Sequence, residues 1–545
     1  MILPPADVAS RVPDIGFRPT TGELFDRAME RHGDADLVVT DTARMSYRAI
    51  DAAARRLALM LLDAGVGKGT RVGAQFPYGP DWIIAWLAVT RIGALFAPLS
   101  TAYKPSELAK VLRFADIHTL LVPDTMFGRD RAPHLEEALG ALEGQEPGRL
   151  RLPSHPFLRS VWFCGERAPG WAVRVASLPT LAAQPLDARE SDYLAAIGSE
   201  VVPADLAMMI YTSGTTSDPK GVIHTHGAMV RHCAALAHLQ EFKPGDRIFA
   251  GMPFFWVGGI STTIMPAILV GATILCIDQF EAERALALMQ REKATRIVAW
   301  LGTVQKIIQG WQTGSYDIPA MDDPVFSPLV PKPHSFFGMT ETCSAHAGAG
   351  PESRFLPLPE GVSGTMGPPL PCIEHRFTDP ETGQEVPPGT EGVISVRGYN
   401  LMYGMVKRER HDVFDADGWY VTGDKGYLRD GMLVYTGRAT DMIKTSGNNV
   451  APPEVEQALA KIDGIREAYV MGIPDRDRDE AVAALVVADG ETEIDTTAVA
   501  DRLRAELSNY KVPRKFVVVR IDDVPMLATG KPDRLTIRRM LETAA

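Results

Sequence analysis

The sequence predicts an α/β fold, with a large N-terminal domain of mainly parallel sheets covered by helices and a small α+β C-terminal domain. Strand-like and helix-like runs alternate through most of the chain, which indicates βα units and a parallel sheet with helices on both faces. At 545 residues, the chain also exceeds what one hydrophobic core usually supports. A break in the pattern at Gly437 divides it into predicted domains of residues 1–436 and 437–545.

The alternation is clearest near the N-terminus. Apolar residues at helical spacing predict helices over residues 56–66 and 81–93, whereas short apolar runs predict strands over 71–77 and 119–124. Residues 128–203 are rich in proline, glycine and charge, and they predict irregular surface connections.

After Gly437 the pattern becomes that of a compact α+β unit within the usual size of a domain. Its five predicted elements are, in order, a helix over 453–462, strands over 467–474 and 480–489, a helix over 498–507 and a strand over 515–520.

The composition excludes several classes of protein. A net charge of −12 argues against a nucleic-acid binder, because such a surface must be basic to neutralise phosphates. The five cysteines are scattered and form no CxxC pair, so neither a disulfide framework nor a zinc site is expected. No signal peptide or transmembrane segment is predicted, and the apolar run 264–277 is too short to span a membrane and predicts buried core. We therefore expect a cytoplasmic protein, for which a homodimer is a possible assembly.

The segment 211–222 carries the strongest local signal. Small hydroxyl residues surround Gly214 and offer donors to phosphate oxygens; they are Thr212, Ser213, Thr215 and Thr216. Lys220 adds a positive charge, and Gly221 permits close approach of the backbone. The spacing does not match the Walker A loop. Taken alone, such a segment is more often an ordinary polar turn.

Four further motifs follow it: FGMTET at 337–342, WYVTGD at 419–424, YTGRATDMIK at 435–444 and ATGK at 528–531. In this order and spacing, the five motifs resemble the adenylate-forming superfamily of acyl-CoA synthetases, aryl-CoA ligases, peptide-synthetase adenylation domains and firefly luciferase. The resemblance extends over nearly the whole chain. It implies ATP, Mg²⁺ and coenzyme A as ligands.

The resemblance also implies roles for single residues at the nucleotide. The loop Thr212–Lys220 would hold the ATP phosphates, and Thr340 would donate a hydrogen bond to the α-phosphate. Phe337 would lie against adenine. Asp424 and Arg438 would bind the ribose hydroxyls.

Metal binding and catalysis are implied in the same way. Glu341, together with Thr212, would bind Mg²⁺, which prefers oxygen ligands. Lys531 would contact the substrate carboxylate and the α-phosphate while negative charge moves there. In the family the small domain rotates between two half-reactions, so Thr440 would be the hinge and Gly447 would lie beside the pantetheine arm of coenzyme A.

The sequence departs from the family pattern at Thr440, where relatives usually have Asp or Lys, and in two further places. Trp256, after Phe254 and Phe255, replaces the usual histidine of the acyl gate and favours a hydrophobic acid. Residues 315–337 contain no glycine but five prolines, where relatives have a glycine-rich strand and a helix. Proline lacks the N–H of a strand, so we expect an irregular loop there and weak ATP binding or low turnover. A rigid extended substitute is the alternative.

The sequence therefore predicts an ATP-dependent acid–thiol ligase that forms an acyl-AMP and then an acyl-CoA from a hydrophobic carboxylic acid. Two alternatives remain, namely a luciferase-type oxidoreductase that acts on an acyl-adenylate and a catalytically impaired homologue. His226 is interpreted as a structural histidine at the start of a helix.

Overall fold

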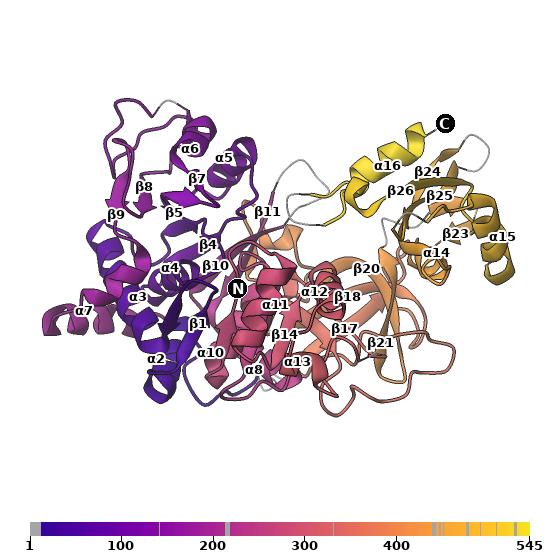
Figure 1. Cartoon of the computed structure of the whole chain (residues 1–545), viewed down its shortest axis with the longest axis horizontal. Coiled ribbons are helices and arrows are strands. Elements are labelled where there is room, and N and C mark those ends of the chain that lie inside the picture. The colour runs from indigo at the N-terminus through magenta and orange to yellow at the C-terminus, as the bar shows by residue number, and fades with distance from the viewer. Residues whose placement is uncertain are drawn as a thin grey trace. The chain divides into compact units, whose positions relative to one another are not determined.

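The computed structural model describes residues 12–140, 142–212, 219–330, 332–438, 443–445, 448–450, 452–475, 479–490, 492–507, 509–527 and 531–544. The chain forms two compact units (Figure 1). The first comprises Met1–Pro357, Leu370–Ile373 and Gly398–Gly418, and the second comprises Leu358–Pro369, Glu374–Arg397 and Trp419–Ala545. The domain boundary at Gly437 stays a prediction.

The first unit contains an eight-stranded sheet in the order β19-β11-β10-β4-β3-β5-β8-β9. Its strands are β19 (Gly404–Met405), β11 (Lys220–Thr225), β10 (Leu206–Thr212), β4 (Leu95–Pro98), β3 (Arg71–Ala74), β5 (Thr119–Pro123), β8 (Ser160–Cys164) and β9 (Val173–Val175). The strands from β10 to β9 are parallel, whereas β11 and β19 are antiparallel to their neighbours. The two strands predicted before residue 125 are thus confirmed as β3 and β5.

A five-stranded sheet lies in the same unit, in the order β14-β12-β13-β1-β2. Its strands are β14 (Arg296–Ala299), β12 (Arg247–Gly251), β13 (Thr273–Leu275), β1 (Asp36–Val39) and β2 (Arg44–Ser46). All pair in parallel except β2, which is antiparallel to β1. Two short hairpins complete the strands of this unit; they are β6 (Thr125–Met126) with β7 (Arg129–Asp130) and β15 (Phe336–Met339) with β16 (Ser344–Gly348).

The helices of the first unit are α2 (Thr21–His32), α3 (Tyr47–Asp63), α4 (Pro80–Arg91), α5 (Pro105–Phe114), α6 (Ala132–Leu139), α7 (Ala188–Ser199), α8 (His226–Leu239), α9 (Val257–Gly259), α10 (Met265–Val270), α11 (Ala282–Arg291), α12 (Leu301–Thr313) and α13 (Pro319–Asp322). Helix α3 begins earlier than predicted, because the Ser46 hydroxyl caps it by accepting from the Ala49 N–H. Helix α4 is buried on every face from Trp82 to Arg91, as its apolar sequence predicts. The run 264–277 forms α10 and β13 within the core, as expected.

The prediction of irregular connections over residues 128–203 is wrong in part. This stretch contains α6, α7, β8 and β9. Strand β8 (Ser160–Cys164) is fully buried inside the large sheet. A parallel strand covered on both faces shows no apolar–polar alternation, so its short apolar run could not be distinguished from a loop among prolines and glycines.

The second unit contains an antiparallel sheet of β17 (Ile373–Thr378), β18 (Gly392–Gly398), β20 (Tyr420–Arg429) and β21 (Met432–Arg438). Its five-stranded sheet consists of β23 (Asn448–Val450), β22 (Ile443–Thr445), β25 (Asp479–Ala488), β24 (Ile465–Asp475) and β26 (Lys515–Val519). Helices α14 (Pro452–Leu459), α15 (Thr496–Glu506) and α16 (Arg534–Thr543) complete the unit. The five elements predicted after Gly437 are confirmed, and α16 is an additional helix.

The fold class is therefore the predicted one: mainly parallel sheets with helices in the large unit, and a smaller unit at the C-terminus. In the part of the chain that the structure describes, no helix is long and apolar enough to cross a membrane.

Candidate nucleotide and acyl site

Strands β10 and β11 frame the predicted phosphate loop. They pair in an antiparallel hairpin that places the backbone of Thr212 opposite that of Lys220. Ser213, Gly214, Thr215 and Thr216 lie outside the described residues, as does the side chain of Thr212. The paired strands thus fix the backbone positions of Thr212 and Lys220, which are the two ends of the predicted loop.

Gly221 is required by packing within the protein. A Cβ atom at this position would lie 2.7 Å from Cγ2 of Val406 and 2.9 Å from Cζ of Tyr211. The Val406 N–H donates to the Gly221 carbonyl at 2.8 Å, so a segment distant in sequence packs directly on β11. The close approach that this glycine permits is therefore to Val406 and to the ring of Tyr211.

The second nucleotide motif forms a tight turn, Thr340–Thr342, between β15 and β16. The two residues after it, Cys343 and Ser344, have φ angles of 56° and 106°. Positive φ is uncommon for residues other than glycine and is often found near functional sites. Only the surrounding contacts can keep the chain in this conformation.

Phe337 lies on β15 and packs its ring against the buried ring of His346, with centroids 5.0 Å apart and planes at 74°. The strand register is shifted at this point, because Phe337 pairs with Ala347 whereas Gly338 pairs with Ala345. His346 is thus the extra residue of a bulge, a feature often found beside active sites. The contact of Phe337 with adenine stays a prediction.

Asp424 and Arg438 lie opposite each other on β20 and β21. The Nε–H of Arg438 donates to Oδ1 of Asp424 at 3.1 Å. The Asp424 N–H also donates to the Thr422 hydroxyl at 3.0 Å. The carboxylate is buried and the Arg438 side chain is half exposed. The structure thus brings together the two residues predicted to bind the ribose.

Lys531 is exposed and lies just before α16. Its carbonyl accepts from the Leu527 N–H at 2.7 Å, and Met526 pairs with Pro532 in an isolated bridge. These two contacts fix the backbone of Lys531 relative to Met526 and Leu527, and the catalytic role of Lys531 stays a prediction. The predicted hinge Thr440 and channel residue Gly447 lie outside the described residues.

The three aromatic residues of the predicted acyl gate differ in their surroundings. Phe254 and Phe255 are buried, and Phe254 stacks on Tyr78 with centroids 5.0 Å apart. A role of either residue in the gate stays a prediction. Trp256 is half-buried and meets Trp300 edge to face at 5.7 Å. Trp300, which is 43% exposed, was not predicted from the sequence. An aromatic residue directly after a short apolar run was the available signal.

The glycine-free segment has the irregular form that its prolines predict. Over its described residues, it contains the short helix α13 and no strand before β15. The Asp323 carboxylate accepts from the N–H groups of Val325 and Phe326 at 2.8 and 2.7 Å. The Phe326 ring lies under the guanidinium groups of Arg296 and Arg354, at 4.0 and 4.6 Å. The segment is therefore irregular but held in place, and weak ATP binding stays a prediction.

His226 is a structural residue, as interpreted. It begins α8, is fully buried, and its Nδ1 lies 3.0 Å from the Thr21 hydroxyl. Burial lowers the pKa of His226 to about 4, so the ring is neutral near pH 7.

Two family patterns match this sequence and identify the family to which the chain belongs. The sequence pattern of the family described as AMP-binding enzyme matches residues 25–406, and that of the AMP-binding enzyme C-terminal domain matches residues 454–531. This chain belongs to the AMP-binding enzyme family.

The relatives of this AMP-binding enzyme match it over nearly its whole length. A putative acyl-CoA synthetase, YngI of Bacillus subtilis, is 26% identical over 95% of this chain and 96% of its own. A 3-[(3aS,4S,7aS)-7a-methyl-1,5-dioxo-octahydro-1H-inden-4-yl]propanoyl:CoA ligase of Mycobacterium tuberculosis is 28% identical over 96% of this chain and 99% of its own. The fold resembles that of the anthranilate CoA ligase AuaEII in complex with anthranoyl-AMP, with a TM-score of 0.79 and 21% identity over 98% of this chain and 99% of that one. The chain is thus an AMP-binding enzyme of the acyl-CoA synthetase type.

The donor chemistry of the first unit fits the predicted magnesium ion. Mg²⁺ at nucleotide sites is usually held by one or two carboxylates together with phosphate oxygens. Glu341 supplies one half-buried carboxylate, and across the described ranges no group of three or more His, Cys, Asp or Glu residues could hold a metal by itself. The binding of Mg²⁺ by Glu341 stays a prediction.

Proposed function

We propose that this AMP-binding enzyme activates a hydrophobic carboxylic acid as its acyl-adenylate and transfers the acyl group to coenzyme A. One observation carries the proposal: the two nucleotide motifs of the first unit are joined. Strand β11, which begins at Lys220, receives backbone hydrogen bonds from Tyr403 and Val406, and the neighbouring Met402 N–H donates to the Glu341 carbonyl at 2.8 Å. The predicted phosphate lysine and the predicted metal ligand are thus parts of one hydrogen-bonded assembly.

In the first half-reaction, a carboxylate oxygen attacks the α-phosphorus of ATP, and pyrophosphate leaves. Lys220 and Lys531 balance the charge that builds on the phosphate oxygens, and the Thr340 hydroxyl donates to the α-phosphate. A magnesium ion held by Glu341 would further neutralise the phosphates.

In the second half-reaction, the thiol of coenzyme A attacks the acyl carbon, loses its proton and expels AMP. Asp424 would accept from the ribose hydroxyls, with Arg438 as donor. Gly447 would leave room for the pantetheine arm, and Thr440 would be the hinge between the two half-reactions.

The hydrophobic character of the acid is supported by the half-buried Trp256 and its neighbour Trp300, which offer apolar rings and no charge. The names of the Bacillus subtilis and Mycobacterium tuberculosis relatives do not specify a common acid. The acid is therefore proposed only as a class.

The test is an assay of coenzyme-A-dependent AMP release over a panel of aliphatic, alicyclic, aromatic and dicarboxylic acids. We expect activity with apolar acids and little with dicarboxylic acids. Preference for a dicarboxylic acid would contradict the proposed substrate class. Light emission that needs oxygen but no thiol would instead indicate the luciferase-type alternative. If no acid of the panel supported pyrophosphate exchange, the protein would be an impaired homologue.

A further inference from the structure

Each carbonyl oxygen of the turn Thr340–Thr342 accepts a hydrogen bond from a residue that is distant in sequence. Met402 N–H donates to the Glu341 carbonyl, and the Asn400 side-chain amide donates to the Thr342 carbonyl at 2.7 Å. The third bond joins Nε2 of His224 to the Thr340 carbonyl, also at 2.7 Å. The backbone of the turn is thus fixed at each of its residues.

His224 lies on β11 and is fully buried. A carbonyl oxygen can only accept, so Nε2 must carry the proton. Burial lowers the pKa of His224 to about 4, which keeps the ring neutral near pH 7 and leaves Nδ1 without a proton. Nδ1 has no hydrogen-bond partner among the residues that the structure describes. An unpaired buried nitrogen costs stability, and the buried Nε2 of His226 is unpaired in the same way among the described residues, so the two histidines differ in what their bonded nitrogen contacts.

Two connections join β11 to the turn, and they differ in what they depend on. One runs through the backbone of residues 402–406, which hydrogen-bonds both to β11 and to Glu341, and it survives substitution of side chains. The other is the direct bond from His224 and depends on a single side-chain atom. His224 and Lys220 are four residues apart on one strand, so their side chains lie on the same face of β11.

Loss of the direct bond should move the turn without unfolding the protein. The Thr340 carbonyl would keep its bond from the Cys343 N–H at 3.1 Å. The positive φ angles of Cys343 and Ser344 would then be less constrained, and the turn could relax toward commoner backbone angles. Because alignment at a reacting phosphate is sensitive to small displacements, a shift of this kind should weaken use of ATP.

We propose that His224 is a positioning residue, which sets the Thr340–Glu341 turn against the strand that begins at Lys220 through its bond to the Thr340 carbonyl. The proposal rests on the proposed function only in that the turn binds ATP. It does not depend on which acid is activated.

The test uses the full chain and three variants at this position. In His224→Gln, the amide nitrogen can take the place of Nε2 and keep the bond. In His224→Asn, the nitrogen falls short, and His224→Leu removes the donor and also the unpaired Nδ1. The matched control is His226→Leu, because His226 is equally buried, has a pKa lowered to the same value, and binds Thr21 rather than the turn.

The readouts are the dissociation constant of Mg-ATP by calorimetry, KM and kcat in pyrophosphate exchange, and the thermal midpoint. We expect His224→Leu and His224→Asn to weaken Mg-ATP binding by roughly 10-fold or more, since one misplaced contact typically changes rates or affinities on that scale. His224→Gln should stay within about 3-fold of the unmodified enzyme, a difference of about 0.65 kcal/mol. His226→Leu should lower the thermal midpoint without changing Mg-ATP affinity.

Unchanged Mg-ATP affinity in His224→Leu and His224→Asn would overturn the proposal. So would an equal loss in His224→Gln, or losses that simply follow the thermal midpoints of all four variants. If the unmodified enzyme showed no exchange with any acid, the proposed function would fail, whereas Mg-ATP binding by calorimetry would still decide the role of His224.

Discussion

Arg438 donates through Nε to the buried carboxylate of Asp424 at 3.1 Å, across the paired strands β20 and β21. The two residues are far enough apart in sequence to belong to different motifs, yet the register of one hairpin places them opposite each other. This pairing fixes one oxygen of Asp424. It also holds Arg438 in place as a donor.

Asp424→Ala should weaken ATP binding. If the carboxylate accepts from the ribose hydroxyls, the loss corresponds to a charge-assisted hydrogen bond of about 1.5–3 kcal/mol, or roughly 10- to 150-fold in affinity. The measurement is KM for ATP in pyrophosphate exchange. Glu374→Gln is the control, because Glu374 pairs with Arg397 at 2.7 Å in the same sheet but has no predicted ligand. Unchanged KM in Asp424→Ala would place the ribose elsewhere.

Lys531→Ala should lower adenylate formation by several orders of magnitude and largely spare thioester formation from supplied acyl-AMP. The reason is that the predicted contacts of this lysine exist only while the α-phosphate is attacked. The two half-reactions are measured separately, with Lys511→Ala as a control for loss of a lysine in the same unit, where Lys511 pairs with Glu454. Equal losses in both half-reactions would refute this division.

Gly447→Leu should have the opposite effect. A branched side chain beside the predicted pantetheine arm would block the thiol while ATP still binds. Pyrophosphate exchange without coenzyme A should stay near its normal rate, and thioester yield should collapse. A normal thioester yield would remove Gly447 from the site.

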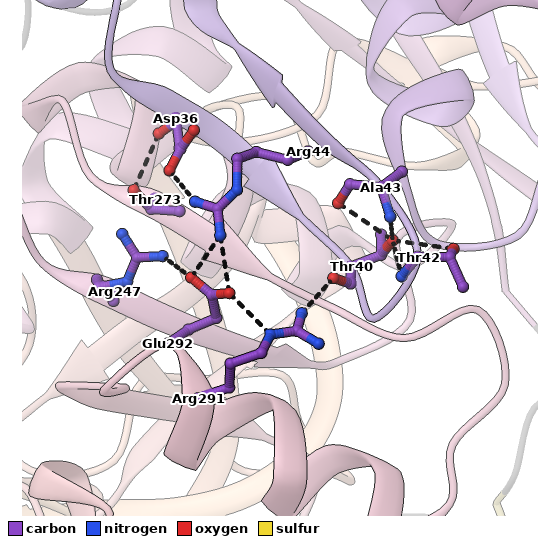
Figure 2. Close-up of polar contacts among 9 residues, drawn as sticks. All are labelled: Asp36, Thr40, Thr42, Ala43, Arg44, Arg247, Thr273, Arg291 and Glu292. Atoms are coloured by element: carbon purple, nitrogen blue, oxygen red, sulfur yellow. Dashed lines mark hydrogen bonds and ion pairs between the residues drawn. The ribbon is translucent and has the colours of Figure 1, made fainter.

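Glu292→Gln should destabilise the first unit. Figure 2 shows the Glu292 carboxylate accepting from Arg44, Arg247 and Arg291, which join β2, β12 and α11. The carboxylate is only 6% exposed, whereas the arginines are partly hydrated. We expect a loss of about 1–3 kcal/mol, below the 3–5 kcal/mol typical when one member of a fully buried pair is removed. The measurement is the urea midpoint at pH 7.

The same site predicts a pH dependence. Burial by itself would raise the pKa of Glu292, but the hydrogen bonds from Arg291 and Arg44 outweigh it and lower the pKa. A lowered folded-state pKa stabilises the protein above the unfolded value, about 4.3, and the gain disappears as pH falls through the folded value. The difference between Glu292 and Gln should therefore shrink in acid. Asp317→Asn, at an exposed pair with Lys293, should show little effect at any pH.

Phe326→Ala should loosen the proline-rich segment. Two guanidinium groups on one ring contribute roughly 1–4 kcal/mol together, and their loss would free the segment from Arg296 and Arg354. Hydrogen exchange of a peptide covering residues 323–330 should accelerate by about 10-fold or more. Phe157→Ala, at an exposed phenylalanine, is the control. Unchanged exchange would mean that the Asp323 turn alone holds the segment.

The sequence by itself determined the family, the fold class and the order of elements after Gly437. Those features are local: glycine and threonine in a fixed order, and apolar residues at period two or 3.6. The partnership of Asp424 and Arg438 could also be predicted, because both stand in recognisable motifs.

Only the tertiary structure decided which distant residues support the site. His224 and Thr340 are 116 residues apart, and neither the strand pattern nor the turn motif indicates that they touch. The packing of Phe254 against Tyr78 could likewise not be predicted from its position two residues before Trp256. Strand β8 gave no periodic signal because both of its faces are buried. Such contacts depend on how strands and loops meet in space, and that geometry is set by packing over the whole unit and not by any short stretch of residues.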